Sequence, residues 1–261
     1  MNDLKDVTFT IPIRVDMRER GICLHVVVGC LLHYFDTNII ILEDDKEQKV
    51  PKYLPKDLLD RCNYIFVKTD NELFHRTRWL NEMAKAATTP IVVNQDGDLA
   101  CKPEFLLRSA NVIRNGECKF SIPYERNVHF YHGGTEKRFI NSGFDFEMLK
   151  KERRANTGQG QVGGIVFSDQ QTYFEIGMEN ENFVSWGFED DERMHRMVAL
   201  GYPPKRITGG ELYHFHHGRN INSDYSNPNL KKNIAERNKI LGMKMDELKT
   251  YVQTWPWIQQ G

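Results

Sequence analysis

Short apolar runs rich in β-branched residues alternate with longer stretches of helical periodicity along the first 110 residues. Strands separated by helices predict βαβ units, because a parallel neighbour needs a crossover connection. The expected fold class is therefore α/β, with a mostly parallel central sheet flanked by helices. The predicted strands are 7–13, 38–42, 64–67 and 91–93, and the predicted helices are 18–33, 74–87 and 103–110.

The pattern changes between residues 124 and 164, where the chain becomes polar and glycine-containing. This composition predicts an irregular excursion over an active site, or a mobile lid. Gly158, Gly160 and Gly163 match a dinucleotide-binding fingerprint in spacing, but no clear strand precedes them and no helix follows, so we give the match little weight. Further on, residues 231–248 predict one charged amphipathic helix with a solvated face.

Length and charge agree with one globular domain. The chain has 261 residues, with 35 Lys and Arg against 36 Asp and Glu, for a formal net charge of −1. This balance argues against binding nucleic acid through bulk charge. We expect a single domain over 1–261, with parts at 1–120 and 121–228 and a C-terminal helix and tail (229–261).

No apolar stretch approaches the ~20 residues that cross a bilayer, so we expect no transmembrane segment. The five cysteines are scattered and lack CxxC spacing, which fits reduced thiols better than a disulfide framework. Both observations favour a cytoplasmic protein, from a bacterial or viral setting, or a catalytic part trimmed of an anchor.

Asp96-Gly97-Asp98 follows the last predicted strand of the first half directly. Ligands of parallel α/β sheets bind at such strand ends. Two carboxylates one residue apart can hold a hard divalent cation and, through it, a diphosphate. A D-G turn with two solvated acids is the equally weighted alternative.

Four consecutive acids begin at Glu189, directly after Trp186-Gly187-Phe188. Acids in the first turn of a helix are favourable near its positive end, which explains one or two of them. A carboxylate close to a tryptophan that can stack on a sugar is also a suitable general base for a hydroxyl nucleophile.

Three of the nine histidines lie within His214-Phe215-His216-His217. Imidazole is a good ligand for Mn or Zn. In a strand, His214 and His216 share a face, whereas in a turn His214 and His217 can converge. A surface histidine cluster is the alternative without a function.

Taken together, these motifs resemble the GT-A-fold inverting glycosyltransferases, nearest the β-1,4-galactosyltransferases of family 7 and the chondroitin-polymerase-type transferase domains of bacteria. The resemblance runs from about Val7 to Arg219. It implies a UDP-sugar donor, a saccharide acceptor, and Mn²⁺ (or Mg²⁺) as cofactor. It implies donor contacts by Pro12, Ile13, Arg14, Phe74, Arg76, Asp96, Gly163 and Gly164, and metal ligation by Asp98, His214 and His217, with His216 in the alternative register.

The same resemblance implies Asp190 as catalytic base and Trp186, Glu189 and Asp191 as acceptor contacts. Ser185 and Phe188 stand where the family has glycine, and Gln161 stands where a family residue helps to choose the donor sugar. We therefore expect a different acceptor pocket. The resemblance favours a galactose-type donor, and we leave the donor open between a hexose and an N-acetylhexosamine. It also implies a nucleotide-sugar-binding half over 1–120 and an acceptor and catalytic half over 121–228.

The expected function is metal-dependent transfer of that sugar to an acceptor hydroxyl, with inversion to a β-linkage. The alternative is a non-catalytic nucleotide-sugar or carbohydrate-binding module on the same fold, which the changes at Ser185 and Phe188 motivate. A nucleotidyltransferase is a weaker third interpretation, because residues 14–20 lack the glycines of a phosphate loop.

Overall fold

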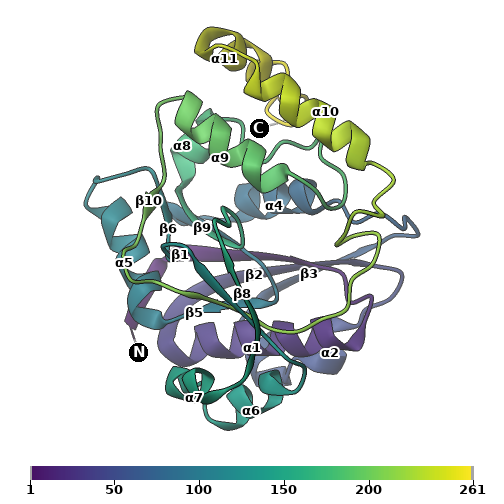
Figure 1. Cartoon of the computed structure of the whole chain (residues 1–261), viewed down its shortest axis with the longest axis vertical. Helices are drawn as coiled ribbons and strands as arrows, with labels where there is room; N and C mark the ends of the chain where they lie inside the picture. Colours follow the sequence, from purple (N-terminus) through teal and green to yellow (C-terminus); the bar gives the residue numbers. More distant parts are fainter. Residues whose placement is uncertain (1, 260–261) are drawn as a thin grey trace.

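A computed structural model describes residues 2–259. Its centre is a seven-stranded sheet in which four of the neighbouring pairs are parallel and β9 pairs antiparallel with both of its neighbours (Figure 1). This is the mostly parallel central sheet of an α/β protein, as predicted. In spatial order the strands are β10 (Lys205–Arg206), β6 (Phe120–Ile122), β9 (Ile165–Asp169), β4 (Ile91–Gln95), β1 (Asn2–Ile13), β2 (Phe35–Asp45) and β3 (Asn63–Lys68).

Helices cover both faces of this sheet (Figure 1). The central strands β1, β2 and β4 are buried along most of their length, because their continuous apolar runs face helices on either side. One face carries α1 (Arg18–Tyr34), α2 (Val50–Tyr53) and α3 (Lys56–Leu59). The other face carries α4 (Arg76–Ala86), α8 (Gln170–Glu175) and α9 (Glu189–Ala199). Helix α5 (Pro103–Arg114) packs beside β6.

The passage 124–164 is more regular than predicted. It contains two antiparallel strands and two short helices, and the strands join a second, four-stranded sheet that the sequence pattern did not reveal. Aromatic side chains from this passage form a satellite core with Cys23 and Cys30 of α1. The elements are β5 (Leu99–Cys101), β11 (Leu212–His214), β7 (Asn127–Tyr131), β8 (Arg154–Gln159), α6 (Thr135–Asn141) and α7 (Phe146–Lys151).

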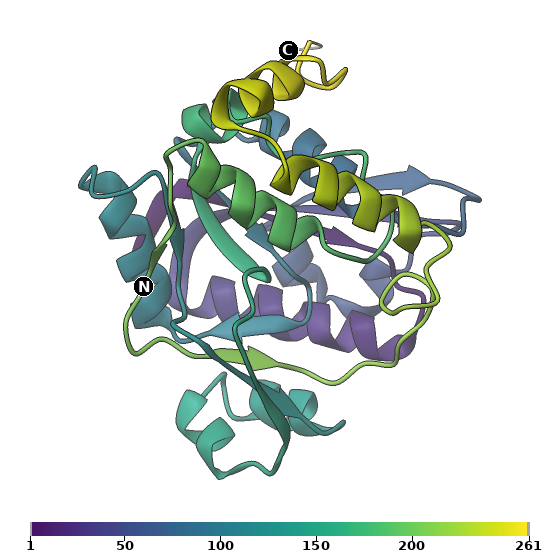
Figure 2. The ribbon, with the colours of Figure 1, turned by 45° about the horizontal axis from the view of Figure 1, so that its top comes forward.

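The C-terminal prediction of one helix over 231–248 is wrong. The chain forms α10 (Leu230–Leu241) and α11 (Met245–Gln253), which pack above α9 (Figure 2). Gly242 is the C-cap residue at which α10 ends. Trp255 and Trp257 then stack on each other with ring centroids 4.9 Å apart, and both are buried in the main hydrophobic core.

None of the helices within residues 2–259 combines the length and apolarity needed to cross a membrane.

Candidate active site

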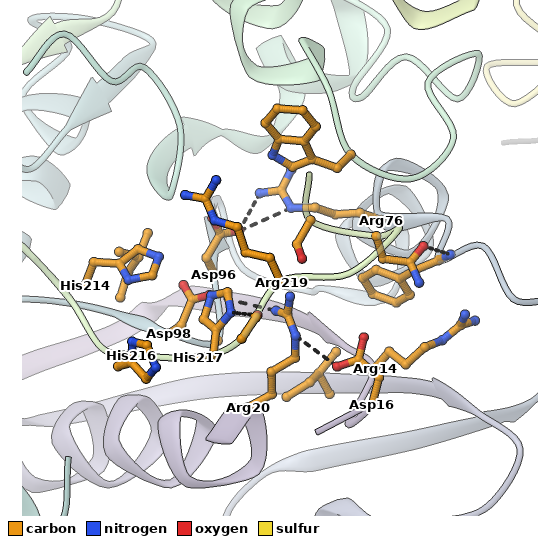
Figure 3. Close-up of a pocket in the computed structure, with 18 of the residues that line it drawn as sticks. Arg14, Asp16, Arg20, Arg76, Asp96, Asp98, His214, His216, His217 and Arg219 are labelled. Carbon is orange, nitrogen blue, oxygen red and sulfur yellow. Dashed lines mark hydrogen bonds and ion pairs between the residues drawn. The ribbon is translucent and has the colours of Figure 1, made fainter. Parts of the chain in front are cut away.

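A cavity of about 610 Å³ opens where β1 and β4 end and the loop after β11 begins. Segments from distant parts of the chain supply its walls, and most of the residues singled out from the sequence line it (Figure 3). The predicted site residues that line it are Pro12, Ile13, Arg14, Phe74, Arg76, Asp96, Asp98, Trp186, Glu189, Asp190, His214, His216 and His217.

The two sheets bring the acid motif and the histidines together. Asp98 lies between β4 and β5, and in the second sheet Leu99 pairs with His214. The backbone N–H of Phe215 donates to the Asp98 carbonyl at 3.0 Å. These main-chain contacts fix the histidine segment against the loop that carries the acids.

Asp98, His214 and His217 form the cluster in which one ligand atom from each residue lies within 4.8 Å of the others. His217 Nε2 is 2.9 Å from Asp98 Oδ2, and the two imidazole centroids are 5.3 Å apart. One carboxylate and two imidazoles are a suitable donor set for Mn²⁺ or a similar divalent ion. The residues present therefore fit the expected metal.

The surroundings of the cluster also suit ligation. His217 Nδ1 lies 2.6 Å from the Gly218 carbonyl, so Nδ1–H can donate there and leave the Nε2 lone pair for a cation. Burial alone would raise the pKa of Asp98, but His214 and His217 outweigh it and hold that pKa well below its ordinary value. Burial lowers the pKa of His214, which favours the neutral, ligating form.

The sequence left open whether His216 or His217 joins His214 in the cluster, and the structure distinguishes the two. Although His216 lines the cavity, it is not part of the cluster, and its backbone N–H donates to Glu136 Oε1 at 2.9 Å. The chain turns after β11, so His214 and His217 converge.

Arg14 forms the wall opposite the histidines. Its Nε and Nη2 donate to the carbonyl and carboxylate of Asp44 at 2.8 and 2.9 Å, and Nη1 donates to the Glu72 carbonyl at 2.8 Å. The guanidinium also lies over the Phe74 ring, 5.5 Å from its centroid. These contacts give this end of the cavity a fixed cation beside an aromatic ring.

Arg76 begins α4 and points to the centre of the cavity (Figure 3). Its Nη2 donates to Asp96 Oδ1 at 2.6 Å, while the buried Nη1 has no hydrogen-bond partner among the described residues. A buried donor without a partner is costly, so an anionic ligand would stabilise this arrangement. Burial raises the pKa of Asp96 to about 6, although Arg76 opposes this shift.

Asp190 lies in the first turn of α9 and points into the cavity. Arg193 Nη2 donates to its Oδ1 at 2.7 Å, and Arg76 Nη1 lies 3.7 Å from the same oxygen. Burial acts to raise the pKa of Asp190, but the two arginines outweigh it and lower that pKa. An ionised carboxylate in this position can accept a proton.

Glu189, the neighbour of Asp190, has the opposite tendency. Burial and the Asp190 charge raise the pKa of Glu189 to about 7. Its Oε2 accepts a hydrogen bond from Gly187 N at 2.9 Å. The two adjacent acids therefore differ in protonation near neutral pH.

Gly163 and Gly164 do not line the cavity, but they support it. A Cβ on Gly163 would lie 1.9 Å from Asp190 Oδ2, so only glycine leaves room for that carboxylate. Gly164 has a φ of +87° and its carbonyl accepts from Asp96 N at 2.8 Å. This glycine pair thus connects the Asp96 loop to Asp190.

Asp191 lies outside the cavity and pairs with Arg237 of α10. The segment before it is strained: Ser185 and Phe188 have φ values of +61° and +70°, in the region that glycine favours. Both are positions at which the resemblance implies glycine, and this chain holds a left-handed backbone there with larger residues.

Sequence reasoning missed the buried residues behind Asp190. Arg193 and Glu179 are each about 1% exposed and pair at 3.0 Å. In the sequence Arg193 is one of several charged residues on a polar helix, and only its i, i+3 spacing from Asp190 could have indicated a contact. Glu179 had no local signal, because its partners come from α4, β4 and α8.

Residues 147–218 match the family described as the N-terminal domain of galactosyltransferase. This segment runs from α7 to the histidine cluster and includes Trp186, Asp190 and His217. Over this segment the chain is galactosyltransferase-like. The resemblance noted in its motifs is thereby confirmed, and so is the expectation of a glycosyltransferase.

Among solved structures, the catalytic domain of Drosophila beta1,4galactosyltransferase 7 in complex with xylobiose is similar to this galactosyltransferase-like protein, with a TM-score of 0.49 and 15% identity. The alignment covers 92% of this chain and 82% of that one. A search of the curated proteins found no match.

Proposed function

We propose that this galactosyltransferase-like protein transfers a hexose or N-acetylhexosamine from a UDP-sugar to a saccharide hydroxyl, with inversion and with a divalent cation. The observation that carries the proposal is the single cavity that gathers three kinds of chemistry: a metal-type cluster, a pair of arginines with an aromatic ring, and an ionised carboxylate beside a tryptophan.

The donor would lie between the cluster and Arg14. Asp98, His214 and His217 would hold the cation, which when bound supplies charge neutralisation for the leaving diphosphate. Phe74 offers a flat apolar face to a nucleobase, and Arg14 is held rigidly above it. The unpartnered Nη1 of Arg76 offers a hydrogen bond to a phosphate or sugar oxygen.

The acceptor would lie on the opposite side, against Trp186. Asp190 accepts the proton from the acceptor hydroxyl as that oxygen attacks the anomeric carbon. Attack from the face opposite the diphosphate gives one displacement and a β-linked product from an α-linked donor. Trp186 can stack on a sugar ring, and its ring meets that of Tyr225 at a centroid distance of 5.0 Å.

The test is a release assay with Mn²⁺ and a panel of UDP-sugars, with and without saccharide acceptors. UDP-sugars that raise the melting temperature are chosen first, because a ligand of the native state raises apparent stability. We expect acceptor-dependent UDP release, and we expect Asp190→Asn to reduce it at least about 100-fold while nucleotide binding persists. Nucleotide binding with no turnover on any acceptor would instead support the non-catalytic module.

A further inference from the structure

Behind the cavity, a buried chain of charges connects Asp190 to the sheet. Arg193 is the central member: Nη2 donates to Asp190 Oδ1 at 2.7 Å, and Nη1 lies 3.0 Å from each oxygen of Glu179. The Arg193 side chain is only 2% exposed and that of Glu179 1%, whereas that of Asp190 is 30% exposed toward the cavity. One guanidinium thus joins a buried acid to an acid that faces the cavity.

Glu179 cannot readily move. Asn94 Nδ2 donates to its Oε1 at 2.7 Å and the Tyr173 hydroxyl donates to the same oxygen at 2.9 Å. Asn81 holds its backbone on both sides, accepting from Glu179 N at 2.8 Å and donating to the Glu179 carbonyl at 3.0 Å. Three elements therefore fix Glu179, and Glu179 fixes Arg193.

The two oxygens of Asp190 differ as a result. Oδ1 is held by Arg193, whereas Oδ2 accepts no hydrogen bond from the groups that the structure describes and lies against the bare Cα of Gly163. A planar guanidinium holds the two carboxylates on separate nitrogens in a fixed geometry, whereas the donors of an ammonium group all lie on one rotatable nitrogen. The geometry leaves Oδ2 as the oxygen available to a proton.

We propose that Arg193, fixed by Glu179, is a positioning residue that holds the Asp190 carboxylate by Oδ1 and presents Oδ2 to the acceptor hydroxyl. This inference rests on the proposed role of Asp190 as base. It goes beyond that role, because it assigns a function to a buried pair that does not line the cavity.

The charge of Arg193, like its hydrogen bond to Oδ1, favours Asp190 as a proton acceptor. It stabilises the ionised form of Asp190, and its removal would raise the pKa of that carboxyl. The other charged groups facing Asp190 are Arg76 on α4, Glu189 on α9 and Asp96 after β4. The Asp190 charge raises the pKa of both acids, and without Arg193 only Arg76 would remain beside Asp190 to favour its ionised form.

A purely structural role would have Arg193 serve only to neutralise Glu179. The chain contains a matched pair for this comparison: Arg196 and Glu192, on the same helix, are equally buried and bonded at 2.6 Å, without contact to Asp190 or the cavity. The double variant Glu179→Gln/Arg193→Met removes the first pair without leaving a buried charge unpaired. Glu192→Gln/Arg196→Met does the same to the second.

The experiment measures kcat against pH for both double variants and for Arg193→Lys, which retains the charge but lacks the second arm. We expect Glu179→Gln/Arg193→Met to lower kcat at least about 10-fold and to move the acid limb up by about one pH unit or more. Arg193→Lys should show a smaller change in the same direction. The Glu192/Arg196 variant should lose thermal stability but keep the wild-type acid limb.

A second readout needs no turnover. The carboxyl ¹³C resonance of Asp190, assigned with Asp190→Asn, should titrate at higher pH in both Arg193 variants than in the wild type. An unmoved resonance and an unmoved acid limb in a folded Arg193→Lys protein would overturn the inference. If Asp190→Asn keeps full activity while the resonance still moves, the proposed base role fails and the contact between Arg193 and Asp190 stands.

Discussion

Replacing Gly163 by alanine tests how closely the glycine pair and the candidate base are packed. The added Cβ would lie 1.9 Å from Asp190 Oδ2, 2.2 Å from Cγ and 2.7 Å from Oδ1, whereas real Cβ contacts stay above 3.0 Å. The backbone φ of Gly163 is not in the left-handed region, so alanine itself causes no backbone strain. The carboxylate must therefore move by more than about 1 Å.

That movement has two consequences. It weakens the hydrogen bond between Arg193 Nη2 and Asp190 Oδ1, and a lost bond to a buried charged group costs about 1.5–3 kcal/mol. It also misplaces the proton acceptor, and an error of about 1 Å in a reacting group can lower the rate by about 100-fold. We expect kcat to fall by about this factor, with a lower melting temperature.

The assay is steady-state UDP release, together with UDP binding by calorimetry in Mn²⁺. UDP affinity should change less than about threefold, because Gly163 does not line the cavity. Gly242→Ala is the control, since its Cβ would make only ordinary contacts of 3.5–3.6 Å in a region far from the site. A folded Gly163→Ala protein with the wild-type kcat would refute the reasoning.

Three further predictions concern the segment around Trp186. Phe188→Gly should raise the free energy of unfolding by about 1 kcal/mol in denaturant titrations, because it removes a φ of +70° from a non-glycine residue; a lower value would count against strain there. Glu189 has a pKa raised to about 7, so the native state binds its proton more tightly than the unfolded state does. The contribution of Glu189 to the free energy of unfolding therefore falls as pH rises from about 4.5 to 7. Glu189→Gln should remove on the order of 2–3 kcal/mol of that pH dependence, and an unchanged profile would show that Glu189 titrates normally. Tyr225, 73% exposed beside Trp186, should contribute to acceptor binding: Tyr225→Ala should raise the acceptor KM several-fold and leave the donor KM unchanged, whereas an unchanged acceptor KM would place the acceptor elsewhere.

The central sheet could be predicted from sequence because its strands are short apolar runs with helical stretches between them. The second sheet could not, since β5 and β11 have three residues each and are held by pairing with partners distant in the chain. The single helix predicted for 231–248 failed because the amphipathic pattern continues across Gly242, where the backbone ends α10.

Residues that face the cavity were also predictable, since they cluster in short motifs such as Asp96-Gly97-Asp98. The choice between His216 and His217 required the turn after β11, which no periodicity encodes. The pairing of Arg193 with Glu179 could be found only in the three-dimensional structure, because a buried ion pair and an exposed one consist of the same residue types in the sequence.

The central claim is that Asp98 and the two histidines hold one cation beneath the diphosphate of the donor. Calorimetric titration of UDP, with Mn²⁺ and with chelator, into the wild-type protein and into Asp98→Ala tests it most directly. We predict Mn²⁺-dependent UDP binding by the wild-type protein and its loss in a folded Asp98→Ala protein. Equal UDP affinity of the two proteins in Mn²⁺ would contradict the claim.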